Sequence, residues 1–199
     1  LADIYRVPVV LLGDGALGQM AEPVELKSIK RKKLPSKDWV LTGAQGREHR
    51  TIIPFSVDPD VIEKMNLDLD HIYQKIRAKE VRCELVNLAN PDIVIIAFGF
   101  MARVIKTVIK MARKEGIEVG LIRPITLWPF PTQIIREVAA RVPHFLVVED
   151  SLGQMVEDVE LAVQGKAEIH FLGILARHQP GSTGMILPRR ILEEVKKII

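Results

Sequence analysis

The segment GDGALG, at positions 13–18, carries residue types and a spacing that could bind a nucleotide. It follows an apolar run and matches G-x-G-x-x-G, whose backbone amides at a helix start can hold a pyrophosphate. That chemistry also needs a second strand ending in an acidic residue about 20 residues later. The sequence shows no strand before Asp38, and Pro23 falls where the second helical turn would lie. We therefore expect a plain tight turn here, with an independent NAD-binding domain as the less favoured alternative.

A second candidate, Glu149-Asp150, ends an apolar stretch at the strand end where α/β sheets bind ligands. Adjacent strand residues point to opposite faces, so the pair is poorly placed for acid–base catalysis and a helix-capping turn is predicted. Cys83 is the only cysteine, which rules out a four-thiolate zinc or iron–sulfur site formed by this chain alone. The histidines show no ligand spacing and predict structural or surface roles: His49, His71, His144, His170 and His178. No metal ligand is predicted.

The stretch RPITLWPFP (123–131) is the most unusual, because it places three prolines, a tryptophan and a phenylalanine at the end of a predicted strand. Such a composition predicts a rigid aromatic loop. Aromatic and arginine side chains favour interfaces, although the loop could also line a cleft. The interface or cleft candidates are Arg123, Thr126, Trp128 and Phe130, and polar contacts are expected from the first two.

Regular elements must position these residues, and they are clearest after residue 90. PDIVIIAFG (91–99) is apolar throughout, as expected for a parallel strand buried on both faces. Helical and strand patterns then alternate: helices over 101–116, 131–142, 153–165 and 189–199, and strands over 117–129, 144–150 and 167–175. This alternation predicts an α/β fold, with an open, mostly parallel twisted sheet and helices on both faces.

The preceding region is rich in charge and turn residues. KSIKRKKLPSK (27–37) holds six basic residues and no aromatic side chain for base stacking, so a linker is favoured over a nucleic-acid or membrane surface. Asp58-Pro59 predicts a helix start, although NLDLD (66–70) interrupts the apolar spacing and leaves one helix or a helix pair open. No apolar run is long enough to cross a bilayer. The single cysteine indicates a reducing compartment, which we take to be the cytoplasm.

The sequence also repeats itself, since LGQMAEPVEL (17–26) and LGQMVEDVEL (152–161) are nearly identical and each follows an apolar run. We interpret both copies as a strand, a sharp turn and a helix start. The first run (7–13) is apolar on both faces and so needs a strand on each side, yet only six residues precede it. We therefore expect residues 1–26 to end a preceding α/β domain, and the chain to be the C-terminal part of a longer polypeptide.

Three stretches together resemble one protein family: PVVLLGDGALGQMAEPV, GLIRPITLWPFP and VVEDSLGQMVEDV. They are similar to the alpha subunit of thiamine-diphosphate-dependent 2-oxoacid:ferredoxin oxidoreductases, of the group acting on 2-oxoglutarate or branched-chain 2-oxoacids. WVLTGAQGREH and NLDLDHIYQKIRAKEV resemble the connector of that subunit. The resemblance implies that residues 1–26 end a pyrimidine-binding thiamine-diphosphate domain, that 27–80 form a connector, and that 81–199 form a domain like the C-terminal domain of transketolase.

The resemblance further implies an enzyme that decarboxylates a 2-oxoacid to an acyl-coenzyme A and passes electrons to ferredoxin. It implies thiamine diphosphate and Mg²⁺ in the complete enzyme and iron–sulfur clusters on partner subunits, with no cofactor bound by this chain alone. The family's catalytic glutamate lies upstream, so no catalytic residue is expected in this chain, and its expected role is assembly and active-site support. The implied partners are a beta subunit, with gamma and delta subunits as further candidates, in a hetero-oligomer that binds neither nucleic acid nor membrane.

One departure from the family lies near the end of the chain, where TGMILPR (183–189) stands in place of Gly-Gly-x-x-Pro-Thr-Pro. No ligand contact of that loop is therefore carried over. The alternative to the family is the C-terminal domain of another thiamine enzyme, such as transketolase or the β chain of a 2-oxoacid dehydrogenase. The stretch RPITLWPFP argues against it, because those proteins are expected to have a different loop there.

Overall fold

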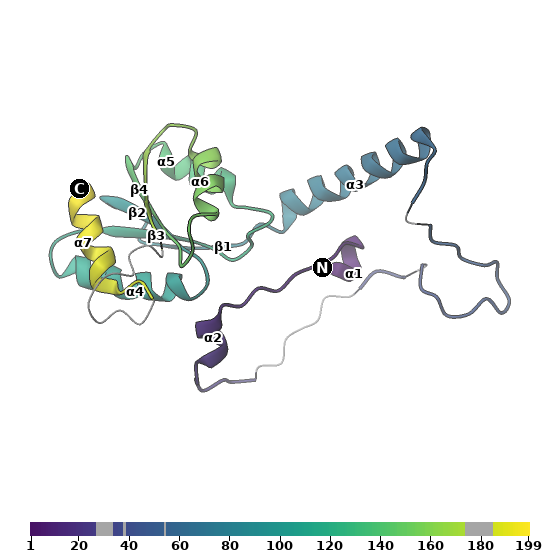
Figure 1. The fold of residues 1–199 in the computed structure, drawn as a ribbon, viewed down its shortest axis with the longest axis horizontal. Helices are drawn as coiled ribbons and strands as arrows, with labels where there is room; N and C mark the ends of the chain where they lie inside the picture. The colour runs from purple at the N-terminus through teal and green to yellow at the C-terminus, as the bar shows by residue number, and fades with distance from the viewer. Residues whose placement is uncertain (27–33, 38, 54, 174–184) are drawn as a thin grey trace. The chain divides into compact units, whose positions relative to one another are not determined.

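The computed structural model describes residues 1–26, 34–37, 39–53, 55–173 and 185–199. Its contacts divide the chain into two compact units. The first unit comprises residues 1–12 and 21–79, and the second comprises residues 13–20 and 80–199. Figure 1 shows the elements of both. Most of the predicted linker at 27–37 lies outside the described residues, as do the end of the strand predicted over 167–175, His178 and the start of TGMILPR.

The second unit is built on a five-stranded sheet in the order β1-β3-β2-β4-β5. Its strands are β1 (Cys83–Val86), β2 (Ile93–Ile96), β3 (Val119–Pro124), β4 (His144–Val148) and β5 (Glu168–Leu172). β1 is antiparallel to β3, and the other neighbouring strands are parallel. The central strand β2 has no exposed residue, as its continuous apolar run predicts for a strand covered on both faces.

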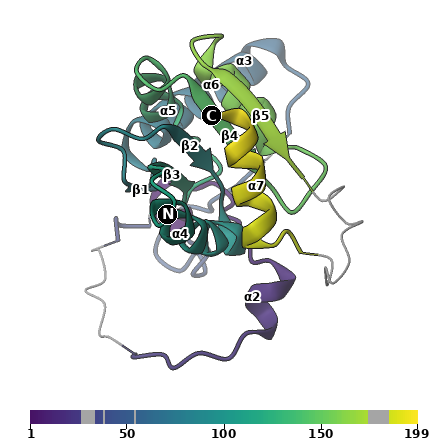
Figure 2. The same ribbon diagram turned by 90° about the vertical axis from the view of Figure 1, so that its left-hand side faces the viewer.

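Two pairs of helices cover the two faces of this sheet, as Figures 1 and 2 show. Helices α4 (Gly99–Arg113) and α7 (Pro188–Ile198) share one apolar cluster with side chains such as Ile95 and Leu146. Helices α5 (Thr132–Ala139) and α6 (Met155–Val163) share the other cluster with alternate residues of the same strands. Helices α4 and α5 cover opposite faces because the chain moves in opposite directions along the sheet from β2 to β3 and from β3 to β4, and both crossovers are right-handed. The predicted α/β class, with a mostly parallel sheet and helices on both faces, is confirmed.

The first unit contains α1 (Ala2–Tyr5) and the long helix α3 (Pro59–Lys79). Asp58 precedes α3, and its side chain accepts a hydrogen bond from the amide of Asp60 at 3.0 Å, as the predicted helix start requires. The helix is continuous through NLDLD. Backbone hydrogen bonds hold a helix together, so an interruption in the apolar spacing of its side chains does not end it. Several of its apolar side chains are more than a third exposed: Val61, Ile62, Met65, Leu67 and Leu69.

The strand predicted over residues 7–13 is wrong: the segment forms no strand in this structure. Most of its apolar side chains are exposed, and Leu11 is 97% exposed. A strand is stabilised by hydrogen bonds to a neighbour, and no strand of the described residues pairs with this segment. The helix that follows, α2 (Gly15–Gln19), is only five residues long and ends well before Pro23. Whether the segment belongs to a preceding domain stays a prediction.

Candidate functional site

The carboxyl ends of the parallel strands form the edge at which α/β sheets bind ligands, and three loops meet the sheet there. They follow β2, β3 and β4, and they carry most of the residues that the sequence singled out. The interactions of each loop decide whether its polar groups are available for chemistry or are used to hold the fold.

Glu149 follows β4 and is 1% exposed, so its carboxylate must be paired inside the protein. It accepts hydrogen bonds from the amides of Gln154, Met155 and Val156, the last two at 3.0 and 2.9 Å. The hydroxyl of Ser151 donates a further bond at 3.1 Å. The three amides lie at the start of α6, whose dipole favours a negative charge. Glu149 therefore caps α6, which confirms the predicted helix-capping turn.

Gly153 lets the chain turn sharply between Glu149 and α6. Its φ of 103° lies in a region that side chains rarely adopt, and a Cβ there would lie 3.2 Å from both Phe171 and Val156. Gly18 holds the same place in the first copy of the repeat, but it lies inside α2 and a Cβ there would meet nothing within 4 Å. The two copies therefore share a sequence without sharing a backbone conformation.

The aromatic loop after β3 is held to the neighbouring chain by Thr126. Its hydroxyl donates to the carbonyl of Pro129 at 2.9 Å and accepts from the amide of Arg82 at 3.0 Å. Phe130 packs against the apolar cluster of α5 and α6, whereas Trp128 is 51% exposed. The peptide bond between Trp128 and Pro129 is cis. Thr126 and Phe130 thus fix the loop, and about half of the Trp128 side chain is accessible to solvent.

Arg123 is used differently from the aromatic residues, because it pairs with Glu84 on the neighbouring strand at 3.0 Å. Lys106 of α4 pairs with the other oxygen of the same carboxylate at 2.6 Å. The hydrogen bonds from Lys106 and Arg123 lower the pKa of Glu84 below its ordinary value. This cluster joins β1, β3 and α4, and its two cations exceed its one anion by a single charge.

Asp14 lies at the loop that follows the central strand. Its carboxylate accepts from the amide of Phe100, in the first turn of α4, at 2.9 Å. The other oxygen accepts from the amide of Leu17, in the first turn of α2, at 2.7 Å. A carboxylate of GDGALG thus occupies a helix terminus at the point where the strand order reverses, the usual ligand position in such sheets.

The GDGALG segment itself does not have the geometry of a nucleotide loop. None of its glycines adopts a positive φ, and a Cβ added to any of them would meet nothing closer than 3.9 Å. A dinucleotide loop instead needs glycines where the backbone turns tightly and approaches the pyrophosphate. The expected plain turn agrees with this geometry, and the NAD-binding alternative has no support in it.

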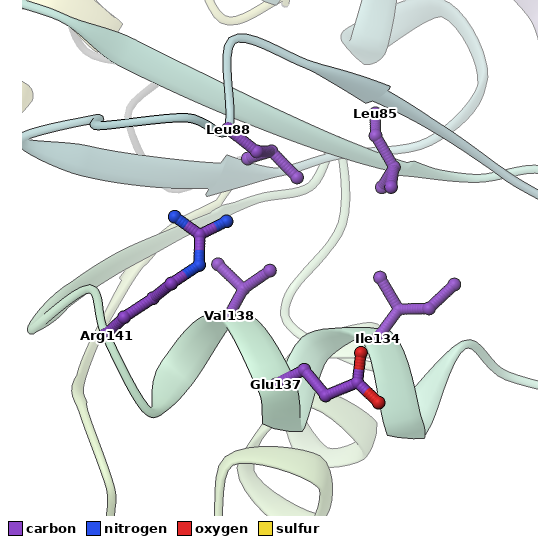
Figure 3. Close-up of a pocket in the computed structure, with 6 residues that line it drawn as sticks. All are labelled: Leu85, Leu88, Ile134, Glu137, Val138 and Arg141. Carbon is purple, nitrogen blue, oxygen red and sulfur yellow. The ribbon is translucent and has the colours of Figure 1, made fainter.

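A pocket of about 350 Å³ lies away from these loops, between α5 and the chain around β1. Figure 3 shows Leu85 and Leu88 pointing across the pocket toward α5. Arg141 at the end of α5 donates to the carbonyl of Ala89 at 3.1 Å and so ties the two sides together. The pattern of the sequence does not indicate this pocket, because it predicts no strand at β1. Its lining residues are Leu85, Leu88, Ile134, Glu137, Val138 and Arg141.

Two of the histidines come together although their sequence spacing gives no indication of it. His144 is the first residue of β4, Glu168 is the first residue of the neighbouring strand β5, and His170 follows Glu168 by two residues. Reasoning from the sequence missed this group because it depends on the register of two strands. The alternation in Glu168-Ile169-His170, which puts two possible ligands on one face of a strand, was the available signal.

Comparison with known proteins identifies similar chains. Residues 91–182 match the family described as pyruvate:ferredoxin oxidoreductase core domain II. Ketoisovalerate oxidoreductase subunit VorB of Methanothermobacter thermautotrophicus is 36% identical over 198 residues, which cover 100% of this chain and 54% of that protein. VorB of Methanothermobacter marburgensis is 40% identical over 81% of this chain and 46% of that protein. 2-Oxoglutarate synthase subunit KorA of the same organism is 33% identical over 86% of this chain and 53% of that protein.

The solved 2-oxoglutarate:ferredoxin oxidoreductase from Magnetococcus marinus, with 2-oxoglutarate, coenzyme A and succinyl-CoA bound, has a similar fold. The TM-score is 0.55 at 19% identity, and the match covers 71% of this chain and 24% of that one. This chain spans about half the length of the curated relatives that it matches. The relatives' names support an oxidoreductase subunit. Among the described residues, no helix combines the length and the apolar character needed to span a membrane.

Proposed function

We propose that this chain is part of the alpha subunit of a thiamine-diphosphate-dependent 2-oxoacid:ferredoxin oxidoreductase, in which it serves assembly and active-site support. The observation that carries the proposal is the 36% identity to a ketoisovalerate oxidoreductase subunit over the whole of this chain. The complete enzyme would decarboxylate a 2-oxoacid to an acyl-coenzyme A and pass the electrons to ferredoxin. The domain boundaries near residues 26 and 80 are part of the same proposal.

The supporting role is favoured by the state of the acidic groups at the carboxyl edge of the sheet. Glu149 accepts from four donors, Glu84 lies between two cations, and Asp14 accepts from two amides. A general base must reach a substrate proton, and a carboxylate already held by internal donors must first release them; for Glu149 this would break the turn into α6. These carboxylates therefore shape the edge of the domain and leave the chemistry to other parts of the enzyme.

We also propose that the cofactors of the enzyme are bound outside this chain. The same three carboxylates are already paired, so they offer no ready ligand set for Mg²⁺ and a diphosphate at this edge. A single cysteine cannot hold a four-thiolate iron–sulfur cluster. We therefore assign thiamine diphosphate, Mg²⁺ and the clusters to the remainder of the enzyme and its partner subunits.

One exposed aromatic side chain supports a role in assembly. Trp128, on the loop after β3, is 51% exposed. Such a side chain gains free energy when a protein surface covers it, at about 25 cal/mol per Å² of apolar area. We propose that Trp128 contacts a partner subunit, with a beta subunit as the first candidate.

Purification of the full-length protein from its native cells, without oxygen, tests the assignment. The proposal predicts that a second subunit accompanies it and that the complex holds iron and thiamine diphosphate in a fixed ratio to protein. A full-length protein that purifies without a partner, and without either cofactor, would contradict the proposal. The ratio of each cofactor to each subunit then shows which subunit binds it.

A further inference from the structure

The amino ends of β4 and β5 bring three possible metal ligands onto one face of the sheet. His144 pairs with Glu168 across the two strands, and His170 lies two residues beyond Glu168. Side chains two residues apart on a strand share a face. Leu146 and Leu172 belong to the cluster of α4 and α7, so the three ligands lie on that face. Figure 2 shows β5 at the edge of the sheet, beside β4.

The donor atoms of this group converge. Nδ1 of His144 lies 3.5 Å from one oxygen of Glu168, and Nε2 of His170 lies 3.5 Å from the other. One donor atom from each of the three residues lies within 4.8 Å of the others. In a tetrahedral zinc site with bonds of about 2.0–2.1 Å, neighbouring donors are about 3.4 Å apart. The observed spacing therefore fits a metal ion with little movement of the side chains.

One ring nitrogen of His144 and one of His170 lack a hydrogen-bond partner in the observed geometry. The two imidazole nitrogens are buried from solvent and make no hydrogen bond among the described residues. A distance of 3.5 Å is longer than a good N–H···O bond, and buried polar atoms without partners are rare. A metal ion bound between the three residues would pair both nitrogens and the carboxylate at once.

Access and ligand type also favour a metal ion. The Glu168 side chain is 64% exposed and the two histidine side chains are each 29% exposed, so an ion can enter from solvent. The final torsion of a glutamate side chain is soft, which lets the carboxylate use one oxygen or both. Two neutral imidazoles and one carboxylate suit zinc and other late divalent metals rather than Mg²⁺ or Ca²⁺.

We propose that His144, Glu168 and His170 form a zinc-binding site that joins the edge strand β5 to β4, with the fourth position open to water. The site lies at the amino ends of the strands, opposite the edge where α/β sheets bind substrates. Its role is therefore to stabilise the sheet edge, and it does not depend on the proposed enzymatic function. Binding to the folded protein alone raises the apparent stability with metal concentration.

Titration of the chelator-treated protein with Zn²⁺ tests the site, with Co²⁺ as a spectroscopic probe. The wild type should bind one equivalent, its Tm should rise with Zn²⁺, and Co²⁺ should give the visible absorption of a low-symmetry, tetrahedral-like site. His170→Gln and Glu168→Gln should each weaken binding at least tenfold. His71→Gln, which changes an exposed histidine on α3, should bind as the wild type does.

The result is decisive without the variants, because a wild type that binds no Zn²⁺ and gives no Co²⁺ absorption would overturn the proposal. Equal binding by the wild type and by a folded His170→Gln variant would also overturn it, since the metal would then lie elsewhere. In either case the three residues would form an imidazole–carboxylate cluster only.

Discussion

Replacing Glu149 by alanine should strongly destabilise the second unit, because one buried side chain holds the whole turn into α6. The carboxylate accepts three backbone amides and one hydroxyl, and it is 1% exposed. Each buried donor left without an acceptor costs about 1–3 kcal/mol, and loss of a helix cap costs about 0.5–2 kcal/mol. Gln154 is exposed, so water can satisfy part of the turn. We therefore expect Glu149→Ala to lower the free energy of unfolding by about 3–5 kcal/mol.

Urea unfolding followed by far-ultraviolet circular dichroism measures this loss. The matched control is Asp150→Ala, which removes the adjacent, exposed carboxylate and should change the free energy of unfolding by less than about 0.5 kcal/mol. Glu149→Gln keeps the size and one acceptor oxygen, so its loss should be intermediate. Backbone amides at the start of α6 should exchange with solvent faster in Glu149→Ala. If Glu149→Ala is as stable as Asp150→Ala, the capping role assigned to Glu149 is wrong.

Three further predictions concern other parts of the second unit. Gly153→Ala should lower the free energy of unfolding, measured by thermal unfolding, by about 1–3 kcal/mol, because φ is 103° at this residue. Gly18→Ala in the other copy of the repeat should not destabilise the protein, and equal effects of the two substitutions would contradict the turn geometry. Lys106 and Arg123 lower the pKa of Glu84, so the stability that this ionised carboxylate contributes should be full above the pKa of glutamate in the unfolded chain and should be lost as the pH falls through the lower pKa of the folded protein. If the stability difference between the wild type and Glu84→Gln does not shrink in acid, this reasoning is wrong. Trp128→Ala should weaken binding to the partner subunit in a pull-down, whereas Leu161→Ala, also at an exposed side chain, should leave binding intact; equal binding by the two folded variants would contradict the proposed contact.

The sequence predicts the central layers of the fold well, because burial on both faces leaves a strong pattern. Ile93–Ile96 and the amphipathic helix after it need no knowledge of distant residues. The same apolar signal at residues 7–13 misleads, since a strand also requires a neighbour and the local sequence does not show one. The sequence does not predict β1, because this edge strand has only four residues and none of their side chains is fully buried.

The sequence predicts which residues belong to the candidate site better than it predicts the role of each residue. The sequence singled out Arg123, Thr126, Trp128 and Phe130, but only the structure shows which of them hold the loop and which is exposed. Their assignment to an interface or a cleft remains a prediction. The group around Glu168 could not be found from spacing along the chain, because strand register brings it together.

The measurement that tests the central claim most directly is viologen reduction by the full-length protein, purified without oxygen together with its accompanying subunits. It should be run with 2-oxoglutarate, pyruvate and a branched-chain 2-oxoacid, each with and without coenzyme A. The account predicts reduction that depends on coenzyme A and on one class of 2-oxoacid. No reduction with any of the acids, in a preparation shown to contain iron and thiamine diphosphate, would contradict it.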